Sequence, residues 1–98
     1  MPPDITQLEK IPPQSIEAEM SLLGSVLLDK DAMLKIADIV QPEDFYKNAH
    51  AQIFSAIVEL YQKNEPIDLL TLSNRLTEKG HLEQTGGHSY LVSLTNAV

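Results

Sequence analysis

The segment PEDFYKNAHAQIF, residues 42–54, brings together the side chains best suited to chemistry: Glu43, Asp44 and His50. Carboxylates beside a histidine are typical of general acid–base catalysis and of metal binding. However, the two acids directly follow a proline, which suits the first turn of a helix, where acidic side chains favour the positive end of the helix dipole. His50 shares a helix face with Phe54, which is typical of a core histidine that makes one hydrogen bond. We interpret the segment as a helix entering a core.

Other common catalytic motifs are absent from the sequence. It has no cysteine, which excludes thiol nucleophiles, disulfides and cysteine-ligated zinc. It has no GxxxxGK[ST] phosphate loop, no GxGxxG motif and no nucleophile-elbow serine. His81 and His88 lie around the Gly86-Gly87 loop and lack the i, i+4 spacing of a zinc helix. The sequence therefore predicts no catalytic, cofactor-binding or metal-binding residue, and no enzymatic activity for this chain by itself.

Length and charge limit the classes of protein further. The 98 residues predict one domain, and a hydrophobic content of 43% is typical of a globular chain. Fourteen acidic and seven basic residues give a net charge of −7, which argues against direct binding of nucleic acid. The start MPPDITQLEK does not resemble a signal peptide, and no apolar run approaches the ~20 residues that span a bilayer. We expect a cytoplasmic domain without a membrane contact.

Proline and hydrophobic periodicity divide the chain into an arm and a helical domain. Four of the six prolines fall in residues 1–14, which predicts an extended, flexible arm. Residues 15–98 then follow a helical pattern. Ser15 is placed to cap a first helix, in which Gly24 predicts a close approach to a neighbouring helix.

Further start and stop signals predict the remaining helices. A short helix follows a cap at Asp29 or Asp31, and another begins at Pro42. A longer helix extends from about Asn48, its predicted cap, to Gln62. Asp68 caps a fourth helix that stops at Gly80, HLEQTGG forms a loop, and a fifth helix starts near Gly87 or His88. No stop signal precedes Val98, so this last helix is expected to be cut within the element.

These elements predict an all-α fold, a compact orthogonal bundle of five to six short helices without a sheet. Its predicted core consists of Met20, Leu23, Leu27, Phe45, His50, Phe54, Ile57, Leu72 and Leu76.

One functional hypothesis is a free-standing helix-turn-helix regulator that binds DNA. The stretch IDLLTLSNRLTEKGHL has the required rhythm of a capped helix, a glycine stop and a further helix. The segment after Gly80 offers Glu83, Gln84 and Thr85 but no arginine, and the net charge is acidic. Charge therefore disfavours this reading.

The second hypothesis is an interaction and assembly module, and four sequence blocks favour it. IPPQSIEAEMSLLGSVLLD, PEDFYKNAHAQIFSAI, PIDLLTLSNRL and GGHSYLVSL, in this order and spacing, resemble the N-terminal domain of the bacterial replicative DNA helicase of the DnaB type. Each block alone is a weak signal, whereas four in sequence are specific. The resemblance extends from about Ile11 to Val98 and leaves out residues 1–10.

The resemblance implies that this domain is one part of a larger, multidomain protein. In that family, a helical hairpin, a linker and a RecA-like motor that binds ATP and Mg follow this domain. Six N-terminal domains form a collar, a hexamer arranged as a trimer of dimers, which receives primase and in some systems a loader protein. The motor hydrolyses ATP and unwinds the fork. This sequence has neither the hairpin nor the motor, so no cofactor-binding residue carries over. An acidic collar also suits a ring that encircles DNA without holding its phosphates.

The resemblance further points to interface residues on the last predicted helix. Because the helix that would cover this element is absent from the sequence, we expect an interface that includes Tyr90, Leu91, Leu94 and Val98. The same i, i+3, i+7 spacing fits a core face equally well, so burial within this domain is the alternative.

Overall fold

The computed structural model describes residues 15–98 and contains only helices and connecting turns in this range. The predicted arm, residues 1–14, lies outside the described residues. The elements are α2 (Ile16–Leu28), α3 (Lys30–Ile36), η1 (Pro42–Asp44), α4 (Asn48–Gln62), α5 (Leu69–Glu78), η2 (Glu83–Thr85) and α6 (Gly87–Thr95), where η denotes a 3₁₀ helix. The predicted all-α fold class is confirmed.

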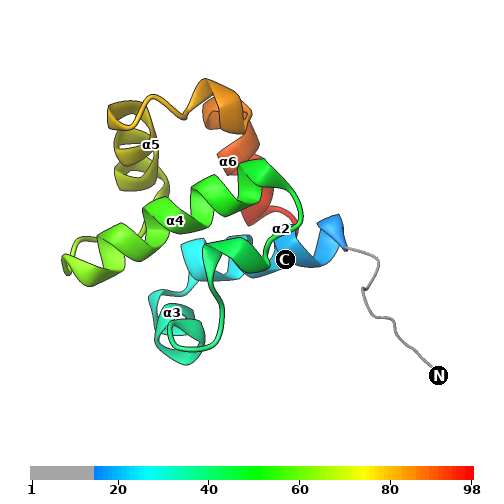
Figure 1. Ribbon diagram of the computed structural model, residues 1–98, viewed down its shortest axis with the longest axis vertical. Helices are drawn as coiled ribbons and strands as arrows, with labels where there is room; N and C mark the ends of the chain where they lie inside the picture. The colour runs from blue at the N-terminus through cyan, green and yellow to red at the C-terminus, as the bar shows by residue number, and fades with distance from the viewer. Residues whose placement is uncertain (1–14) are drawn as a thin grey trace.

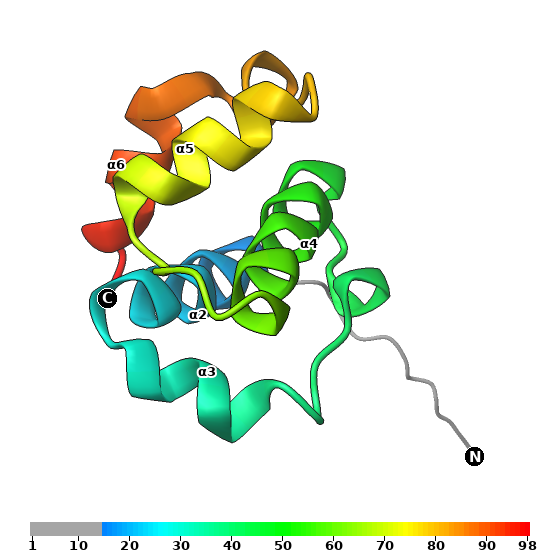
Figure 2. The ribbon, with the colours of Figure 1, turned by 90° about the vertical axis from the view of Figure 1, so that its left-hand side faces the viewer.

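Helix α4 lies at the centre of the bundle, with α5 on one side and α2 on the other (Figure 1). The start of α6 lies near α5, and its end packs against α2 (Figure 2). Helix α3 lies below α2, on the side away from α5. None of the helices between residues 15 and 98 has the length and apolar character needed to cross a membrane.

Three of the predicted helix caps are confirmed. The side chains of Ser15, Asp29 and Asp68 accept hydrogen bonds from backbone N–H groups in the first turns of α2, α3 and α5. Each bond satisfies one of the N–H groups that a helix start leaves unpaired. These three helix starts are therefore fixed by local sequence.

The predicted cap of α4 is wrong. Lys47 occupies the cap position without a side-chain hydrogen bond, and Asn48 is the first helical residue. The carboxylate of Glu19 in α2 instead accepts the backbone N–H of Tyr46 at 2.6 Å and that of Lys47 at 3.4 Å. A distant acid therefore fixes the chain at the entrance to this helix.

The C-terminal part differs from the prediction in two places. The segment predicted as a loop, HLEQTGG, contains the short helix η2. The last helix ends at Thr95 rather than continuing to Val98. The backbone of Ala97 turns toward α2, where its carbonyl oxygen accepts a hydrogen bond of 2.8 Å from Ser21 Oγ. This tertiary bond, which the sequence pattern does not reveal, accompanies the end of the helix.

The stop at Gly80 is confirmed. Gly80 has a φ of 76°, and the N–H groups of Gly80 and His81 bond back to the carbonyl oxygens of Thr77 and Leu76. This is the Schellman arrangement, which glycine adopts without steric cost.

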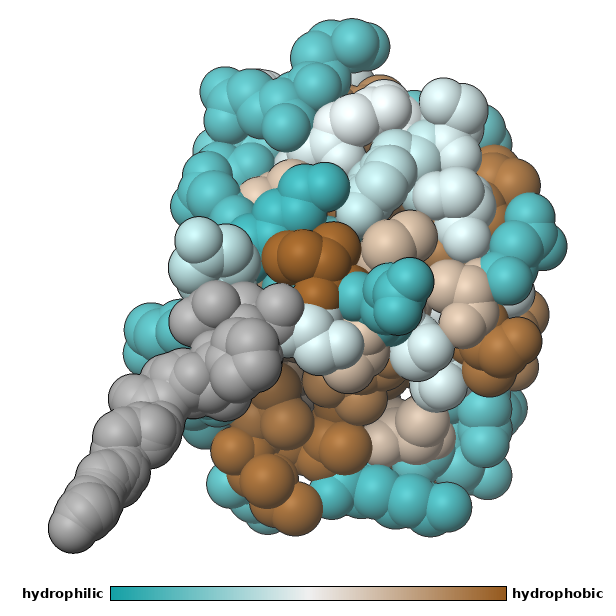
Figure 3. Space-filling model, turned by 90° about the vertical axis from the view of Figure 1, so that its right-hand side faces the viewer, coloured by the Kyte–Doolittle hydropathy of each residue, from teal (hydrophilic) through white to brown (hydrophobic). Residues whose placement is uncertain are grey.

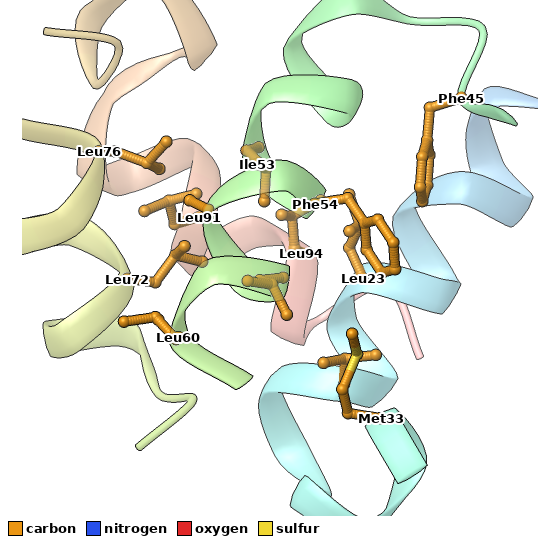
Figure 4. Close-up of a cluster of buried hydrophobic side chains, with 13 residues drawn as sticks. Leu23, Met33, Phe45, Ile53, Phe54, Leu60, Leu72, Leu76, Leu91 and Leu94 are labelled. Carbon is orange, nitrogen blue, oxygen red and sulfur yellow. The ribbon is translucent and has the colours of Figure 1, made fainter. Parts of the chain in front are cut away.

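The hydrophobic core joins all the α-helices (Figure 4). Of the residues predicted for it, seven are buried: Leu23, Phe45, His50, Phe54, Ile57, Leu72 and Leu76. Met20 and Leu27 are partly buried and pack against its edge. The core also includes Val26, Met33, Ile53, Ala56, Leu60, Leu91 and Leu94.

Gly24 marks the closest approach of α2 to the C-terminal part of the chain. A Cβ atom built at this position would overlap the carbonyl oxygen of Leu94 and lie 2.8 Å from Cγ2 of Val98. The predicted role of Gly24 as a close-approach residue is confirmed.

Candidate functional site: a polar junction and two apolar hollows

Glu19, His50 and Tyr90 form a polar junction inside the bundle. The His50 ring is fully buried, with Nδ1 2.7 Å from Oε1 of Glu19 and Nε2 2.6 Å from the hydroxyl oxygen of Tyr90. An ionised carboxylate only accepts, so Nδ1 donates to Glu19, and in the neutral ring Nε2 accepts from the Tyr90 hydroxyl. The three side chains come from α2, α4 and α6, and they therefore tie these helices together.

The junction is more extensive than the single hydrogen bond predicted for His50. The rings of His50 and Tyr90 are stacked, with centroids 5.9 Å apart. The Nζ atom of Lys47 lies 4.9 Å from the centroid of the Tyr90 ring and 3.5 Å from its hydroxyl oxygen. Buried polar groups that pair with each other fix a single arrangement, because any other packing leaves them without partners.

The junction has the order acid, histidine and hydroxyl that is found in catalytic triads, but not their surroundings. The hollow that reaches it is lined by Glu19 and Phe45 rather than by Tyr90. Glu43 and Asp44, the two acids that the sequence places near His50, lie exposed on η1, and Asp44 accepts the N–H of Gln41. Within residues 15–98, no group of three or more potential ligands is arranged to hold a metal ion. What the geometry shows of the junction is a set of contacts that join α2, α4 and α6.

Two further sets of polar contacts were not predicted from the sequence. Nδ1 of His88, at the start of α6, lies 2.9 Å from Oγ of Ser73 in α5. Arg75, the single arginine of the sequence, has Nη1 3.6 Å from Oε1 of Glu59 and Nη2 3.5 Å from Oε1 of Glu65. This guanidinium is therefore held by acids of its own chain.

The predicted interface residues fall into two groups. Leu91 and Leu94 are fully buried and belong to the core of this chain. Tyr90 is half-buried in the polar junction, and Val98 is 67% exposed. Of the four, Val98 is the side chain most available to a partner.

Two surface hollows lie along α2. The first, here called the α2–η1 hollow, has a volume of about 240 Å³ and is lined by Ala18, Glu19, Leu22, Val40, Asp44 and Phe45. The second measures about 430 Å³ and is lined by Glu17, Met20, Ser21 and Ala97. Apolar residues also gather on the face that carries the start of α2, in its lower part, at the level of α3 and the turn that follows it (Figure 3).

Several known proteins contain a domain whose sequence is similar to this helical domain. A family model described as the DnaB-like helicase N terminal domain matches residues 11–98. The replicative DNA helicase DnaB of Geobacillus stearothermophilus is 48% identical over 90 residues, which make up 92% of this chain and 20% of that protein. The replicative DNA helicase DnaC of Bacillus subtilis (strain 168) is 38% identical over 90 residues, which again make up 92% of this chain and 20% of that protein. The chain thus spans about a fifth of the length of these curated relatives.

A solved structure shares the fold as well as the sequence. The crystal structure of the N-terminal domain of DnaB helicase from Mycobacterium tuberculosis superposes with a TM-score of 0.85 and 41% sequence identity. The match covers 90% of this chain and 61% of that one. The resemblance predicted from the four sequence blocks is confirmed, and the chain belongs to the DnaB-like helicase N-terminal domain family.

Proposed function

We propose that this chain is the interaction and assembly domain of a hexameric replicative DNA helicase, in which it supports the ring and receives primase and, in some systems, a loader protein. The observation that carries the proposal is the family match, which extends over residues 11–98 and hence over the whole described domain. The curated relatives are named replicative DNA helicases.

Two features of the domain support an assembly role: a firmly packed interior and apolar side chains exposed at its surface. The polar junction and the core hold the helices in one arrangement, as an adaptor requires. Val98 is 67% exposed, and its neighbour Ala97 lines the second hollow together with Met20 of α2. A single exposed apolar residue does not mark a contact site, but Val98 follows Ala97 at the lining of this hollow, so the two together offer a surface on which a partner can pack. We assign the contact between subunits to this region of the domain.

ATP-driven unwinding belongs, in this proposal, to the motor of the whole helicase. The sequence of this chain contains no phosphate loop, so ATP and Mg would be bound elsewhere in such a protein. The net charge of −7 and the ion pairs of Arg75 also argue against a role of this domain in holding DNA phosphates.

The composition and burial of α6 argue against the helix-turn-helix alternative. This helix would have to enter the major groove, yet its sequence GHSYLVSLT contains no lysine or arginine. Leu91 and Leu94 also bind it into the core of the domain. No specific observation favours a DNA-binding regulator.

Primase docking is tested by isothermal titration calorimetry of the 98-residue chain with the primase of the same organism. We expect saturable binding, because the proposed docking role requires no motor domain. The docking role would be contradicted if the titration gives no heat of binding and the two proteins do not co-elute in size-exclusion chromatography. Circular dichroism must show in the same experiment that the chain is helical.

Ring assembly is tested on the whole helicase by sedimentation velocity. We expect Val98→Asp to shift the protein from hexamers toward smaller species, because it places a charge on an exposed apolar contact. Leu70→Asp is the matched control, since Leu70 is 69% exposed and lies on α5. If both variants form hexamers of equal stability, Val98 is not part of the interface.

A further inference from the structure

We propose that the α2–η1 hollow is a docking site for a basic amphipathic helix of a partner protein. This inference rests on the proposed docking function and gives that function a location and a kind of ligand.

The floor of the hollow is apolar and firmly supported. Ala18 and Leu22 come from α2, while Val40 and Phe45 lie just before and just after η1. The Phe45 ring packs on Phe54, with centroids 5.1 Å apart. The volume of about 240 Å³ lies below the roughly 300–1,000 Å³ of small-molecule sites. The hollow therefore suits apolar side chains inserted by another protein better than a metabolite.

Two large apolar side chains that are next in sequence to residues of this floor are open to water. Ile39, next to Val40, is 73% exposed, and Tyr46, next to Phe45, is 66% exposed. Burying an exposed isoleucine against a partner removes apolar area from water and so strengthens binding. The hollow and these two side chains together offer an anchor site and further apolar surface.

Glu19 and Asp44 line the hollow, and further acids lie on the segments that form its walls. The Glu19 carboxylate is bonded to His50 and to backbone N–H groups, so the charge open to a partner comes from the exposed acids Asp38, Glu43 and Asp44. The two segments that form its walls, residues 15–28 and 38–44, contain no lysine or arginine but five acids: Glu17, Glu19, Asp38, Glu43 and Asp44. Lys47, the next basic residue, contacts Tyr90. An apolar centre with a charged rim is the usual anatomy of a protein interface, and the sign of the rim selects partners of opposite sign.

This charge pattern decides between possible occupants. A nucleic acid would bring phosphates against carboxylates. In a two-fold contact at the hollow, its acidic residues would face the same acidic residues of a second copy, so this particular surface disfavours a second copy as occupant. A basic segment of a different protein is complementary. It would bind as a helix rather than as an added strand, because residues 15–98 offer no sheet edge to extend.

The test uses a fluorescein-labelled amphipathic helix of leucine and lysine as the probe, and an otherwise identical peptide with glutamate in place of lysine. Fluorescence anisotropy measures binding to the wild-type chain, to Ile39→Ser and to Leu70→Ser. Ile39 and Leu70 are similarly exposed, at 73% and 69%, but Leu70 lies on α5, away from the hollow. Both substitutions leave the core untouched.

We expect the lysine peptide to bind saturably to the wild type and to Leu70→Ser, and about tenfold more weakly to Ile39→Ser, as loss of one buried apolar side chain implies. The glutamate peptide should not bind. Equal affinity for all three chains, binding of the glutamate peptide, or no saturable binding would each overturn the proposal. A dimer of the chain that Ile39→Ser dissociates would also overturn it, since the occupant would then be a second copy.

Titration of primase separates this inference from the proposed function. Primase that binds wild type and Ile39→Ser equally would leave the docking function standing and overturn the location. Primase that binds neither would remove the docking function, and the peptide experiment would still decide what the hollow binds.

Discussion

Replacing Gly24 with alanine tests how closely α2 packs against the chain around Leu94. In an isolated helix, alanine is more favourable than glycine by about 1 kcal/mol. In this fold the added Cβ would overlap the carbonyl oxygen of Leu94 and lie 2.8 Å from Cγ2 of Val98. Because the nearest neighbour is backbone, it can move only if the two segments separate.

The expected net effect is a loss of stability. Adding a methyl group to a well-packed contact costs about 1–3 kcal/mol, and a backbone neighbour places Gly24→Ala in the upper part of that range. After the gain in helix propensity is subtracted, the free energy of unfolding should fall by about 1–2 kcal/mol. For a domain of this size, each kcal/mol lowers the melting temperature by about 4–8 °C.

Urea unfolding followed by circular dichroism measures this change. Ser25→Ala serves as the control, because the neighbouring residue gains helix propensity without adding an atom at the close contact. We expect Ser25→Ala to match or slightly exceed the wild type in stability. If Gly24→Ala is as stable as the wild type, the two segments do not approach each other as closely as the structure indicates.

Three other substitutions probe the cap, the junction and the core, and a fourth is a control at the surface; all four are measured by urea unfolding. Asp68→Ala should lower the free energy of unfolding by about 1 kcal/mol, because α5 loses its N-cap; no change would mean that the cap is dispensable. His50→Phe should cost about 1–3 kcal/mol, because Glu19 and Tyr90 each lose their hydrogen bond to the buried ring, and a stabilised variant would argue against the junction. Leu94→Asp should prevent folding, since the side chain is fully buried, whereas a folded variant that fails only in assembly would make Leu94 an interface residue. Leu28→Ser, at a position 61% exposed, should stay within about 0.5 kcal/mol of the wild type.

Local signals predict most of the helix boundaries of this fold. Ser15, Asp29 and Asp68 act through hydrogen bonds to residues two or three positions away, so their effect is visible in the sequence. Gly80 likewise ends α5 through backbone bonds in its own turn. Where the determining contact is local, pattern and capping rules suffice.

The features that could not be predicted depend on residues far apart in the chain. Glu19 lies 31 positions from His50, and Tyr90 lies 40 positions from it. Each of these residues is unremarkable in its own segment, and only the packing of α2 and α6 against α4 brings them together. The wrong cap of α4 has the same origin, because Glu19 supplies what a local side chain was expected to provide.

The interface residues show a different limit of the sequence pattern. Leu91 and Val98 fall in the same helical stripe, yet the first is fully buried and the second is 67% exposed. Apolar spacing predicts that a face is covered but not by which element. Here α2 packs against α6, and the chain leaves the helix before Val98.

The most direct test of the domain as a docking module is hydrogen–deuterium exchange of the chain with and without the primase of the same organism. We expect slower exchange in the complex at the start of α2 and over residues 38–46, which contain residues that line the α2–η1 hollow and the exposed side chains of Ile39 and Tyr46. The N–H groups of α5 should exchange at an unchanged rate. Unchanged exchange throughout at saturating primase, or protection confined to α5, would contradict this account.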